Sequence, residues 1–358
     1  MEENTIIYEK NKCTILLKSF FIIFISILVV HSIKYMKLNN KNPKIIQMDM
    51  NNKRNINKLK RQKRSLYKSN PNFNHIHISL SFNNDYYLLS SITISSILKN
   101  AFNTTFIHFH IIETGDFIPE TRKKLSSLIY RLNNNSDFIF YNGSQVIQDF
   151  GEEIKTHNYG LGEYCRLLSP EFILEDKVLV LDSGDILVEK DLTELFNREL
   201  NDKLVLAVLD PYVKCFEDYP LFLKENYING GVVLFNTKKW RKMGIYKDIV
   251  KFYKAFNYKN KLRLPFQDIL NTFLPYLSIG FLPLKYNFQD NPYIEEDECV
   301  IFNKSEIQDA KINAIIRHNN KMKPEKGEGD KNLKWKYYGN LTGFFDEICN
   351  KYPKGCNL

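Results

Sequence analysis

Two carboxylates, Asp182 and Asp185, follow directly on a short apolar segment, and they are the residues of this chain best suited to chemistry. Val178–Leu181 is wholly apolar and half β-branched, which is typical of a strand buried on both faces of a parallel sheet. Open α/β sheets bind ligands at the carboxyl ends of their strands, and hard divalent cations share oxygen ligands with substrate phosphates. The pattern therefore indicates a metal and phosphate site. A turn in which the aspartates cap the next segment is the alternative.

The segments before this strand alternate between strand and helix patterns, and this alternation sets the fold class. We expect strands at His75–Phe82, Phe106–Ile112 and Asp137–Tyr141, with helices at Leu88–Leu98 and Glu120–Leu132 between them. Strand–helix–strand units form right-handed crossovers, so they predict an α/β fold with a parallel sheet covered by helices. The later segments predict a helix at Tyr159–Leu168, a short helix at Leu192–Phe196, strands at Leu204–Leu209 and within 226–236, a helix opening at Pro265, and a last apolar run at Ala314–Ile316.

The net charge of +9 over 358 residues is concentrated in one segment. Residues 34–68 hold twelve Lys or Arg and a single acid, Asp49, while the rest of the chain is close to neutral. No RNA- or DNA-binding motif accompanies this basic segment, so we expect no nucleic-acid partner. The 44% of hydrophobic residues is enough for the remaining chain to bury a substantial core.

The amino-terminal segments predict a membrane protein. Ile15–Ile33 is largely apolar, and about 19 such residues can cross the hydrocarbon core of a bilayer. We interpret 15–33 as a single transmembrane anchor after a short tail, 1–14; a cleaved signal peptide is the alternative, but no clear cleavage site follows. Residues 34–73 are rich in Asn and Lys and predict a disordered stem. A folded body, 74–324, and a carboxyl-terminal extension, 325–358, complete the chain.

Orientation signals in the chain conflict. The heavier positive charge after the anchor favours a cytosolic body. Five N-glycosylation sequons in the body favour a lumenal one. They lie at Asn103, Asn134, Asn142, Asn303 and Asn340.

The cysteines carry one prediction. Cys349 and Cys356 are close enough in sequence for a small-loop disulfide if the compartment is oxidising. The absence of Cys-x-x-Cys argues against a structural zinc site.

Three further segments place polar residues beside predicted elements. Adjacent glycines, Gly230 and Gly231, precede a buried strand and let the backbone approach something closely. Gln267 and Asp268 lie at the amino end of a helix, and His318 follows the last apolar run. Each has an ordinary structural alternative: a glycine turn, helix capping, or a satisfied histidine at a strand end.

The order of these segments resembles glycosyltransferase family 8, the retaining sugar-nucleotide transferases that include glycogenin and bacterial lipopolysaccharide galactosyltransferases. The resemblance spans about 250 residues, from Asn74 to Lys323. Its motifs are Tyr-x-Arg-Leu, Leu-Asp followed by Asp-Ile-Leu-Val, Asn-Gly-Gly-Val-x-x-x-Asn, and Gln-Asp-Ile-Leu-Asn, with a looser match at the histidine. It implies a single nucleotide-binding, Rossmann-like domain of GT-A type, with a mixed, mainly parallel central sheet.

The resemblance also implies a metal and nucleotide site. Asp185 matches the second aspartate of the family's Asp-x-Asp motif and His318 its histidine ligand, so that together with the diphosphate of UDP they would bind Mn²⁺ or Mg²⁺. The residues that match nucleotide, diphosphate or metal-proximal positions are Asn83, Asp85, Tyr86, Arg166, Asp182, Ser183, Gly230 and Lys323. Taken alone, Asn83 and Asp85 would form an Asx turn, Arg166 a surface ion pair, and Lys323 a solvated charge.

Three residues match the family's donor-sugar positions. Gln267 corresponds to the residue near the anomeric carbon, and Asn229 and Asp268 to contacts with the donor sugar. Such retaining enzymes are generally thought to work without a covalent carboxylate nucleophile, the acceptor attacking on the leaving-group face.

Two departures from the family pattern bear on the site. The metal motif is Asp-Ser-Gly-Asp, one residue longer than Asp-x-Asp, so either Asp182 reaches the ion through a bulged turn or Ser183 takes the first aspartate's place. Phe266 stands where the family often has Asp, which leaves the donor sugar open.

The predicted function is a metal-dependent retaining transfer of a hexose or pentose from a UDP-sugar to a glycan, protein or lipid acceptor. From the family's usual topology and the sequons, we expect a single-pass type II membrane protein facing the Golgi or endoplasmic reticulum lumen. A catalytically degenerate homologue that binds nucleotide sugar or glycan is the first alternative. A second is a membrane-surface protein whose basic stem binds anionic lipid. Trp335, Tyr337 and Tyr338 either line an acceptor site or cover the core.

Overall fold

The computed structural model describes residues 73–133, 135–151, 154, 160–215, 226–256, 262–289, 291, 294–321, 323–328 and 332–356. The predicted tail, anchor and stem therefore lie outside the described residues, except for residue 73. No helix within the ranges just given is long and apolar enough to cross a membrane. Pro71–Leu358 is one compact unit.

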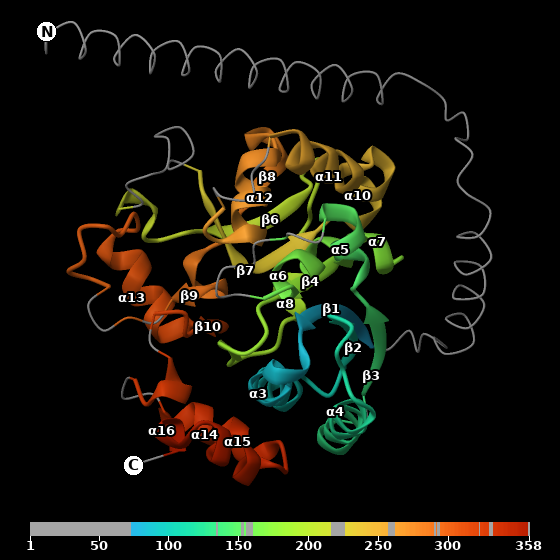
Figure 1. Cartoon of the computed structure of the whole chain (residues 1–358). Helices are drawn as coiled ribbons and strands as arrows, with labels where there is room; N and C mark the ends of the chain where they lie inside the picture. The colour runs from blue at the N-terminus through green and yellow to red at the C-terminus, as the bar shows by residue number, and fades with distance from the viewer. Residues whose placement is uncertain are drawn as a thin grey trace, which may run out of the picture. The chain divides into compact units, whose positions relative to one another are not determined.

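The first part of the body follows the predicted alternation. It runs β1 (Asn74–Phe82), α3 (Tyr87–Asn100), β2 (Thr105–Glu113), α4 (Pro119–Leu132) and β3 (Ser136–Asn142), each within two residues of its predicted bounds. These three strands are parallel and adjacent, as Figure 1 shows. The βαβ prediction is confirmed.

The central sheet is mixed, as the family resemblance implied. Its order is β3-β2-β1-β4-β7-β6-β8, with β4 (Val178–Leu181), β7 (Ile228–Phe235), β6 (Val205–Leu209) and β8 (Ile279–Phe281) following the first three strands. Strand β4 is parallel to β1, whereas β7 is antiparallel to both of its neighbours. The reversed strand brings its amino end to the edge of the sheet where β1, β4 and β6 end.

A second, three-stranded sheet brings distant parts of the chain together. It consists of β5 (Ile186–Val188), β10 (Ile316–His318) and β9 (Phe288–Gln289). Strand β10 pairs antiparallel with β5, and His318 lies opposite Ile186. The predicted run Ala314–Ile316 shares only Ile316 with this strand. The helix α13 (Lys304–Asn313) ends directly before the run, and the first two residues of the run connect the helix to β10.

One predicted helix is broken. Instead of a continuous helix over Tyr159–Leu168, the described residues form α6 (Gly162–Cys165), a 3₁₀ turn and α7 (Ser169–Phe172). Pro170 lies in the first turn of α7, where its missing N–H is tolerated but where it cannot continue the preceding hydrogen-bond ladder.

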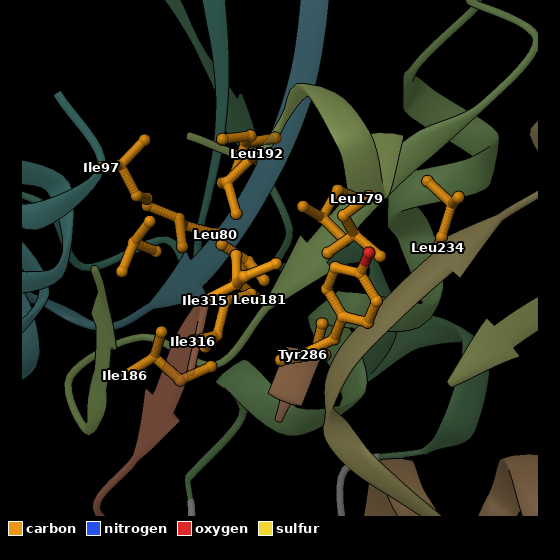
Figure 2. Close-up of a cluster of buried hydrophobic side chains, with 14 of the residues drawn as sticks. Leu80, Ile97, Leu179, Leu181, Ile186, Leu192, Leu234, Tyr286, Ile315 and Ile316 are labelled. Carbon is orange, nitrogen blue, oxygen red and sulfur yellow. The ribbon is translucent and has the colours of Figure 1, made fainter. Parts of the chain in front are cut away.

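Helices cover both faces of the central sheet. Side chains from α3, α4 and α13 pack into one buried cluster, and those from α5 (Gln145–Phe150), α10 (Thr237–Met243), α11 (Ile245–Phe256) and α12 (Pro265–Phe273) pack into another. Figure 2 shows part of the first cluster, in which Leu80, Leu181 and Ile316 from three strands are all fully buried. Each such side chain contributes about 1.5–3 kcal/mol of hydrophobic stabilisation. The short helix α8 (Thr193–Phe196) matches its prediction.

The carboxyl-terminal extension packs on α3. It forms α14 (Asn332–Leu341), α15 (Phe345–Lys351) and α16 (Pro353–Cys356). Trp335 and Tyr338 are buried against the leucines of α3, which agrees with the core-covering alternative, whereas Tyr337 is exposed.

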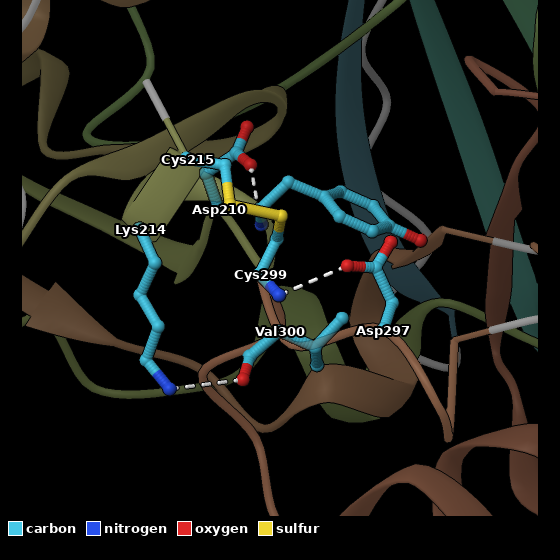
Figure 3. Close-up of a disulfide and its surroundings, with 7 residues drawn as sticks. Asp210, Lys214, Cys215, Asp297, Cys299 and Val300 are labelled. Atoms are coloured by element: carbon cyan, nitrogen blue, oxygen red, sulfur yellow. Dashed lines mark hydrogen bonds between the residues drawn. A yellow bond between two sulfur atoms is a disulfide. The ribbon is translucent and has the colours of Figure 1, made fainter. Parts of the chain in front are cut away.

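Two disulfides are present among the described residues. Cys349–Cys356 confirms the pairing expected from sequence. Cys215–Cys299 was not predicted, because its partners are 84 residues apart and spacing alone gives no signal for such a pair. Figure 3 shows this disulfide beside Asp210, with Cys299 N donating to Asp297. It links the turn after β6 to the loop before α13.

We expect the Cys215→Ser/Cys299→Ser variant to be markedly less stable, because opening a loop of 84 residues restores chain entropy to the unfolded state. Loop length gives a loss of about 4.5 kcal/mol, against about 2.5 kcal/mol for opening the short Cys349–Cys356 loop. Chemical unfolding of this variant and of Cys349→Ser/Cys356→Ser, both in the compact unit, measures the two losses of unfolding free energy. Equal stability losses would contradict the loop-length argument.

Candidate nucleotide-sugar site

The predicted site residues meet in a cleft at one edge of the central sheet. The cleft has a volume of about 820 Å³ and lies at the carboxyl ends of β1, β4 and β6 and the amino end of β7. Most of the residues singled out from sequence line it: Asn83, Tyr86, Arg166, Asp182, Ser183, Asp185, Asn229, Gly230, Gln267, His318 and Lys323. The sheet-edge rule that was applied to Asp182 and Asp185 thus correctly located the cleft.

Asp182, Asp185 and His318 form a cluster of potential metal ligands. Their ligand atoms all lie within 4.8 Å of one another. His318 Nε2 is 3.4 Å from Asp185 Oδ1 and 3.7 Å from Asp182 Oδ2. Both His318 Nε2 and Asp185 Oδ1 are buried without a hydrogen-bond partner in the described structure. Buried lone pairs that converge in this way fit a divalent cation that accepts imidazole and carboxylate, as Mn²⁺ does.

The extra residue in the metal motif is accommodated by a turn at Gly184. Gly184 has φ +138°, a conformation that a side chain would strain, and it carries the chain from Asp182 to Asp185. Ser183 Oγ accepts a hydrogen bond from Ser81 N at 3.1 Å and is thereby committed to the backbone of β1. Of the two candidates for the first ligand, the geometry therefore favours Asp182.

The charges around the cluster are balanced by a lysine. Burial alone would raise the pKa of Asp185, but Lys323 and His318 outweigh it and hold the pKa well below its usual range. Lys323 Nζ lies 2.8 Å from Asp185 Oδ2. Burial disfavours the charged amine, yet Asp185 raises the Lys323 pKa above its ordinary value. Asp185 is therefore ionised and ready to bind a cation at any physiological pH.

Arg166 is buried rather than a surface ion pair. Its guanidinium pairs with Asp182 and, at 2.8 Å, with Glu163 Oε1. Arg166 Cζ also lies 5.3 Å from the centroid of the Phe266 ring. Phe266, which stands where the family often has Asp, therefore packs against the arginine. Burial raises the pKa of Glu163 to about 7, although Arg166 opposes the rise.

The two adjacent glycines of β7 admit the protein's own side chains. A Cβ at Gly231 would lie 2.3 Å from His318 Cε1, and one at Gly230 would lie 3.1 Å from Gln267 Cβ. The close approach inferred from sequence is thus confirmed. What approaches the strand is the histidine of the metal cluster and the glutamine of α12.

A buried carboxylate that we had not singled out, Asp210, orders the donor-sugar residues. Its Oδ2 accepts from Asn229 Nδ2 at 2.9 Å and from Gln267 Nε2 at 3.1 Å. Gln267 Oε1 in turn accepts from Gly230 N at 2.7 Å. Asp210 follows directly on the apolar strand β6, so the signal that identified Asp182 could also have identified it.

Asn287 is a second residue that sequence reasoning missed, and it shows that Nδ1 of His318 carries a proton. Gly231 N donates to Asn229 Oδ1, which also accepts from Asn287 Nδ2 at 2.8 Å. The other amide atom of Asn287 is therefore its oxygen, 3.0 Å from His318 Nδ1. Because that oxygen can only accept, His318 carries a proton on Nδ1, and its Nε2 is the ring nitrogen that faces the carboxylates.

Two predicted residues lie elsewhere. Asp268, expected to contact the donor sugar, is outside the cleft lining and instead accepts from Tyr227 OH and from the backbone N–H groups of Arg263 and Leu264. These contacts agree with the capping alternative, because the Asp268 carboxylate binds backbone N–H groups near the start of α12. Asp85, expected beside the nucleotide, is also outside the lining, with its side chain 84% exposed. Asn83 lines the cleft and caps the next turn by accepting from Tyr86 N.

The sequence profile described as glycosyl transferase family 8 matches residues 77–324, which include every cleft residue named above. The chain belongs to this family. The resemblance inferred from the ordered motifs is confirmed. Family 8 enzymes are retaining glycosyltransferases.

Relatives of known name are also glycosyltransferases. GlyE of Streptococcus pneumoniae is 36% identical over 98 residues, covering 27% of this chain and 21% of GlyE. GlyA of the same species is 25% identical over 291 residues, covering 79% of this chain and 36% of GlyA. A galacturonosyltransferase-like protein of Arabidopsis thaliana is 24% identical over 208 residues, covering 52% of each chain. This chain thus spans less than two thirds of each relative.

Solved structures share the fold. An active-site variant of LgtC aligns with a TM-score of 0.61 at 24% identity, covering 75% of this chain and 95% of LgtC. The bifunctional glycosyltransferase WbbM aligns with a TM-score of 0.67 at 20% identity, covering 78% of this chain and 52% of WbbM. At these identities the likeness establishes the α/β architecture with its mixed sheet.

The geometry predicts that Asp182 and Ser183 differ in their effect on metal affinity. Asp182→Asn should weaken Mn²⁺ binding at least about tenfold, because it removes an anionic ligand. Ser183→Ala should leave Mn²⁺ affinity nearly unchanged, because Ser183 Oγ bonds the backbone of β1. Titration of each purified variant with Mn²⁺, followed by electron paramagnetic resonance of the free ion, compares them. A larger loss in Ser183→Ala would return the ligand role to the serine.

Proposed function

We propose that this chain is a metal-dependent retaining glycosyltransferase that moves a hexose or pentose from a UDP-sugar to a glycan, protein or lipid acceptor. The observation that carries the proposal is the convergence of Asp182, Asp185 and His318 in the same cleft as the ordered network around Gln267. Asp185 Oδ1 and His318 Nε2 are buried there without a hydrogen-bond partner among the described residues. The network supplies polar groups for a sugar, and the cluster supplies a site for a cation that a diphosphate can share.

A divalent cation and two charged side chains would have different roles in binding the diphosphate. A divalent cation in the cluster would neutralise negative charge that builds on the departing UDP. Lys323 presents an ammonium group at the edge of the same cluster, where it can donate to phosphate oxygens while it remains charged. Arg166 is held rigidly beside Asp182 by its two carboxylate partners and by Phe266, so it keeps Asp182 oriented.

The residues on the sugar side favour positioning over covalent catalysis. Asp210 already accepts from Asn229 and Gln267 on one oxygen and from Tyr212 N on the other. A carboxylate so engaged is a poor nucleophile and a good anchor for the two amides. Gln267 is thereby fixed by both ends of its side chain, as a residue placed beside an anomeric carbon needs to be.

An incomplete metal cluster would favour the catalytically degenerate alternative. The distances between His318 and both carboxylates are short enough for one ion to join all three, so the geometry favours turnover. The donor sugar stays open, because the similar proteins include a galactosyltransferase and a xylosyltransferase.

UDP release by the purified compact unit, Pro71–Leu358, tests the proposal with a panel of UDP-sugars. We expect slow hydrolysis of one donor in the presence of Mn²⁺, abolished by EDTA and reduced at least about a hundredfold by Asp185→Ala. Ser183→Ala serves as a matched control that should retain activity. If UDP binds but no donor is turned over, the degenerate alternative is correct. If UDP does not bind, the nucleotide-sugar assignment is wrong.

We also infer that the body folds in an oxidising compartment, in support of the lumenal orientation. The two disulfides are typical of secreted and lumenal proteins and rare in the cytosol. Within the described residues, the sequon asparagines Asn103, Asn142, Asn303 and Asn340 are all exposed, as glycosylation requires.

Alkylation of the denatured chain from its natural host checks this orientation. Without reduction only Cys13 and Cys165 should be modified, and reduction should expose four more thiols. Treatment with a peptide N-glycosidase should also lower the apparent mass. Six reactive thiols before reduction and no glycan would place the body in the cytosol.

A further inference from the structure

Histidines are concentrated on one face of β1 and β2, away from the cleft. Four of the seven histidines of the chain lie there: His75 and His77 on β1, and His108 and His110 on β2. The parallel register sets His77 opposite His108, so that all four side chains share a face of the sheet. His77 is five residues before Phe82 at the cleft, about 17 Å along an extended strand.

One pair of these histidines forms a chain of hydrogen bonds rather than a group of potential metal ligands. His75 Nδ1 lies 2.8 Å from His108 Nε2, and His108 Nδ1 lies 2.7 Å from Asp137 Oδ1. The two partners of His108 are on opposite nitrogens of its ring. Their ligand atoms therefore do not converge on one point.

The other pair does converge, together with a carboxylate. His77 Nδ1 faces His110 Nε2 at 3.1 Å, and ligand atoms of His77, His110 and Glu175 all lie within 4.8 Å of one another. Glu175 belongs to the loop between α7 and β4. Its backbone carbonyl accepts from Thr237 Oγ1 and Arg241 Nη2 of α10, which fixes the residue against the sheet.

The separation of the two histidine nitrogens suits a hydrogen bond and is also compatible with a tetrahedral metal site. Two imidazole nitrogens bound to one Zn²⁺ at about 2.0–2.1 Å lie about 3.3 Å apart, close to the observed separation of His77 and His110. His110 Nδ1 lies 3.0 Å from Tyr141 OH, an outer partner of the kind that orients a ligating histidine. His77 is only partly buried, which leaves a path for an ion to enter.

We propose that His77, His110 and Glu175 bind one divalent cation of the zinc class, with water in the fourth position. Two imidazoles and one carboxylate are a donor set that suits zinc, and no cysteine is needed. The bound ion ties the loop before β4 to β1 and β2. Because β4 delivers Asp182 to the cleft, the site stabilises the strand that carries the metal motif, and its existence does not depend on the proposed transfer reaction.

Cobalt binding to the full-length chain tests this site, because four-coordinate Co²⁺ absorbs visible light where Mn²⁺ and Zn²⁺ do not. The Asp185→Ala variant removes a ligand of the other cluster and serves as the background. In it we expect one equivalent of Co²⁺ with the intense visible bands of a four-coordinate site, displaced by one equivalent of Zn²⁺. Glu175→Gln and His77→Gln should each weaken binding at least about tenfold.

His75→Gln is the matched control, because His75 lies on the same strand face but does not belong to the convergent group. It should bind cobalt as the background does. Glu175→Gln keeps the size of the side chain, so it decides the matter if His77→Gln fails to fold. The proposal is overturned if the background binds no cobalt, if Glu175→Gln binds it unchanged, or if His75→Gln weakens binding as much as His77→Gln does.

Discussion

The pairing of β10 with β5 is the interaction on which the cleft depends. It sets His318 opposite Ile186, and Asn319 N donates to Asp185 O at 2.7 Å, so two segments that are distant in the chain become neighbours. Without this short antiparallel ladder, the histidine would have no fixed relation to the carboxylates. The ladder also brings Lys323 to Asp185, which supplies the positive charge that keeps this buried carboxylate ionised.

The reversal of β7 is the second constraint, because it turns the sheet edge into a site for a sugar as well as for phosphate. In a wholly parallel sheet, the amino end of this strand would lie at the opposite edge. Here it places Asn229 beside Asp210 at the end of β6, and its two glycines let His318 and Gln267 pack directly on the strand. Asn287 then connects the sugar side to the metal side through a continuous line of hydrogen bonds.

Burial gives these polar groups their chemical character. A buried donor or acceptor without a partner costs about 1–3 kcal/mol, so the network around Asp210 is satisfied almost throughout. His318 Nε2 and Asp185 Oδ1 are among the buried atoms without a partner in the described residues, and these two lie where a cation would bind. A different criterion, the clustering of ligand atoms, distinguishes the two histidine pairs on β1 and β2: His77 and His110 form such a group with Glu175.

The sequence was enough to predict the alternation from β1 to β3, and its resemblance to family 8 supplied most of the candidate residues that line the cleft. Apolar strands that end in polar residues predicted Asp182 and Asp185, because the side-chain pattern of a buried strand is local and its end lies at the sheet edge. It could not decide between Asp182 and Ser183, which depends on the Gly184 turn and on a bond from Ser81. Asp85 and Asp268 lie outside the cleft lining: Asp85 is exposed, and Asp268 accepts from backbone N–H groups near the start of α12. Asn287, the Cys215–Cys299 pair and the convergence of His77 with Glu175 were decided only by the tertiary structure, because each joins segments whose separation along the chain carries no periodic signal.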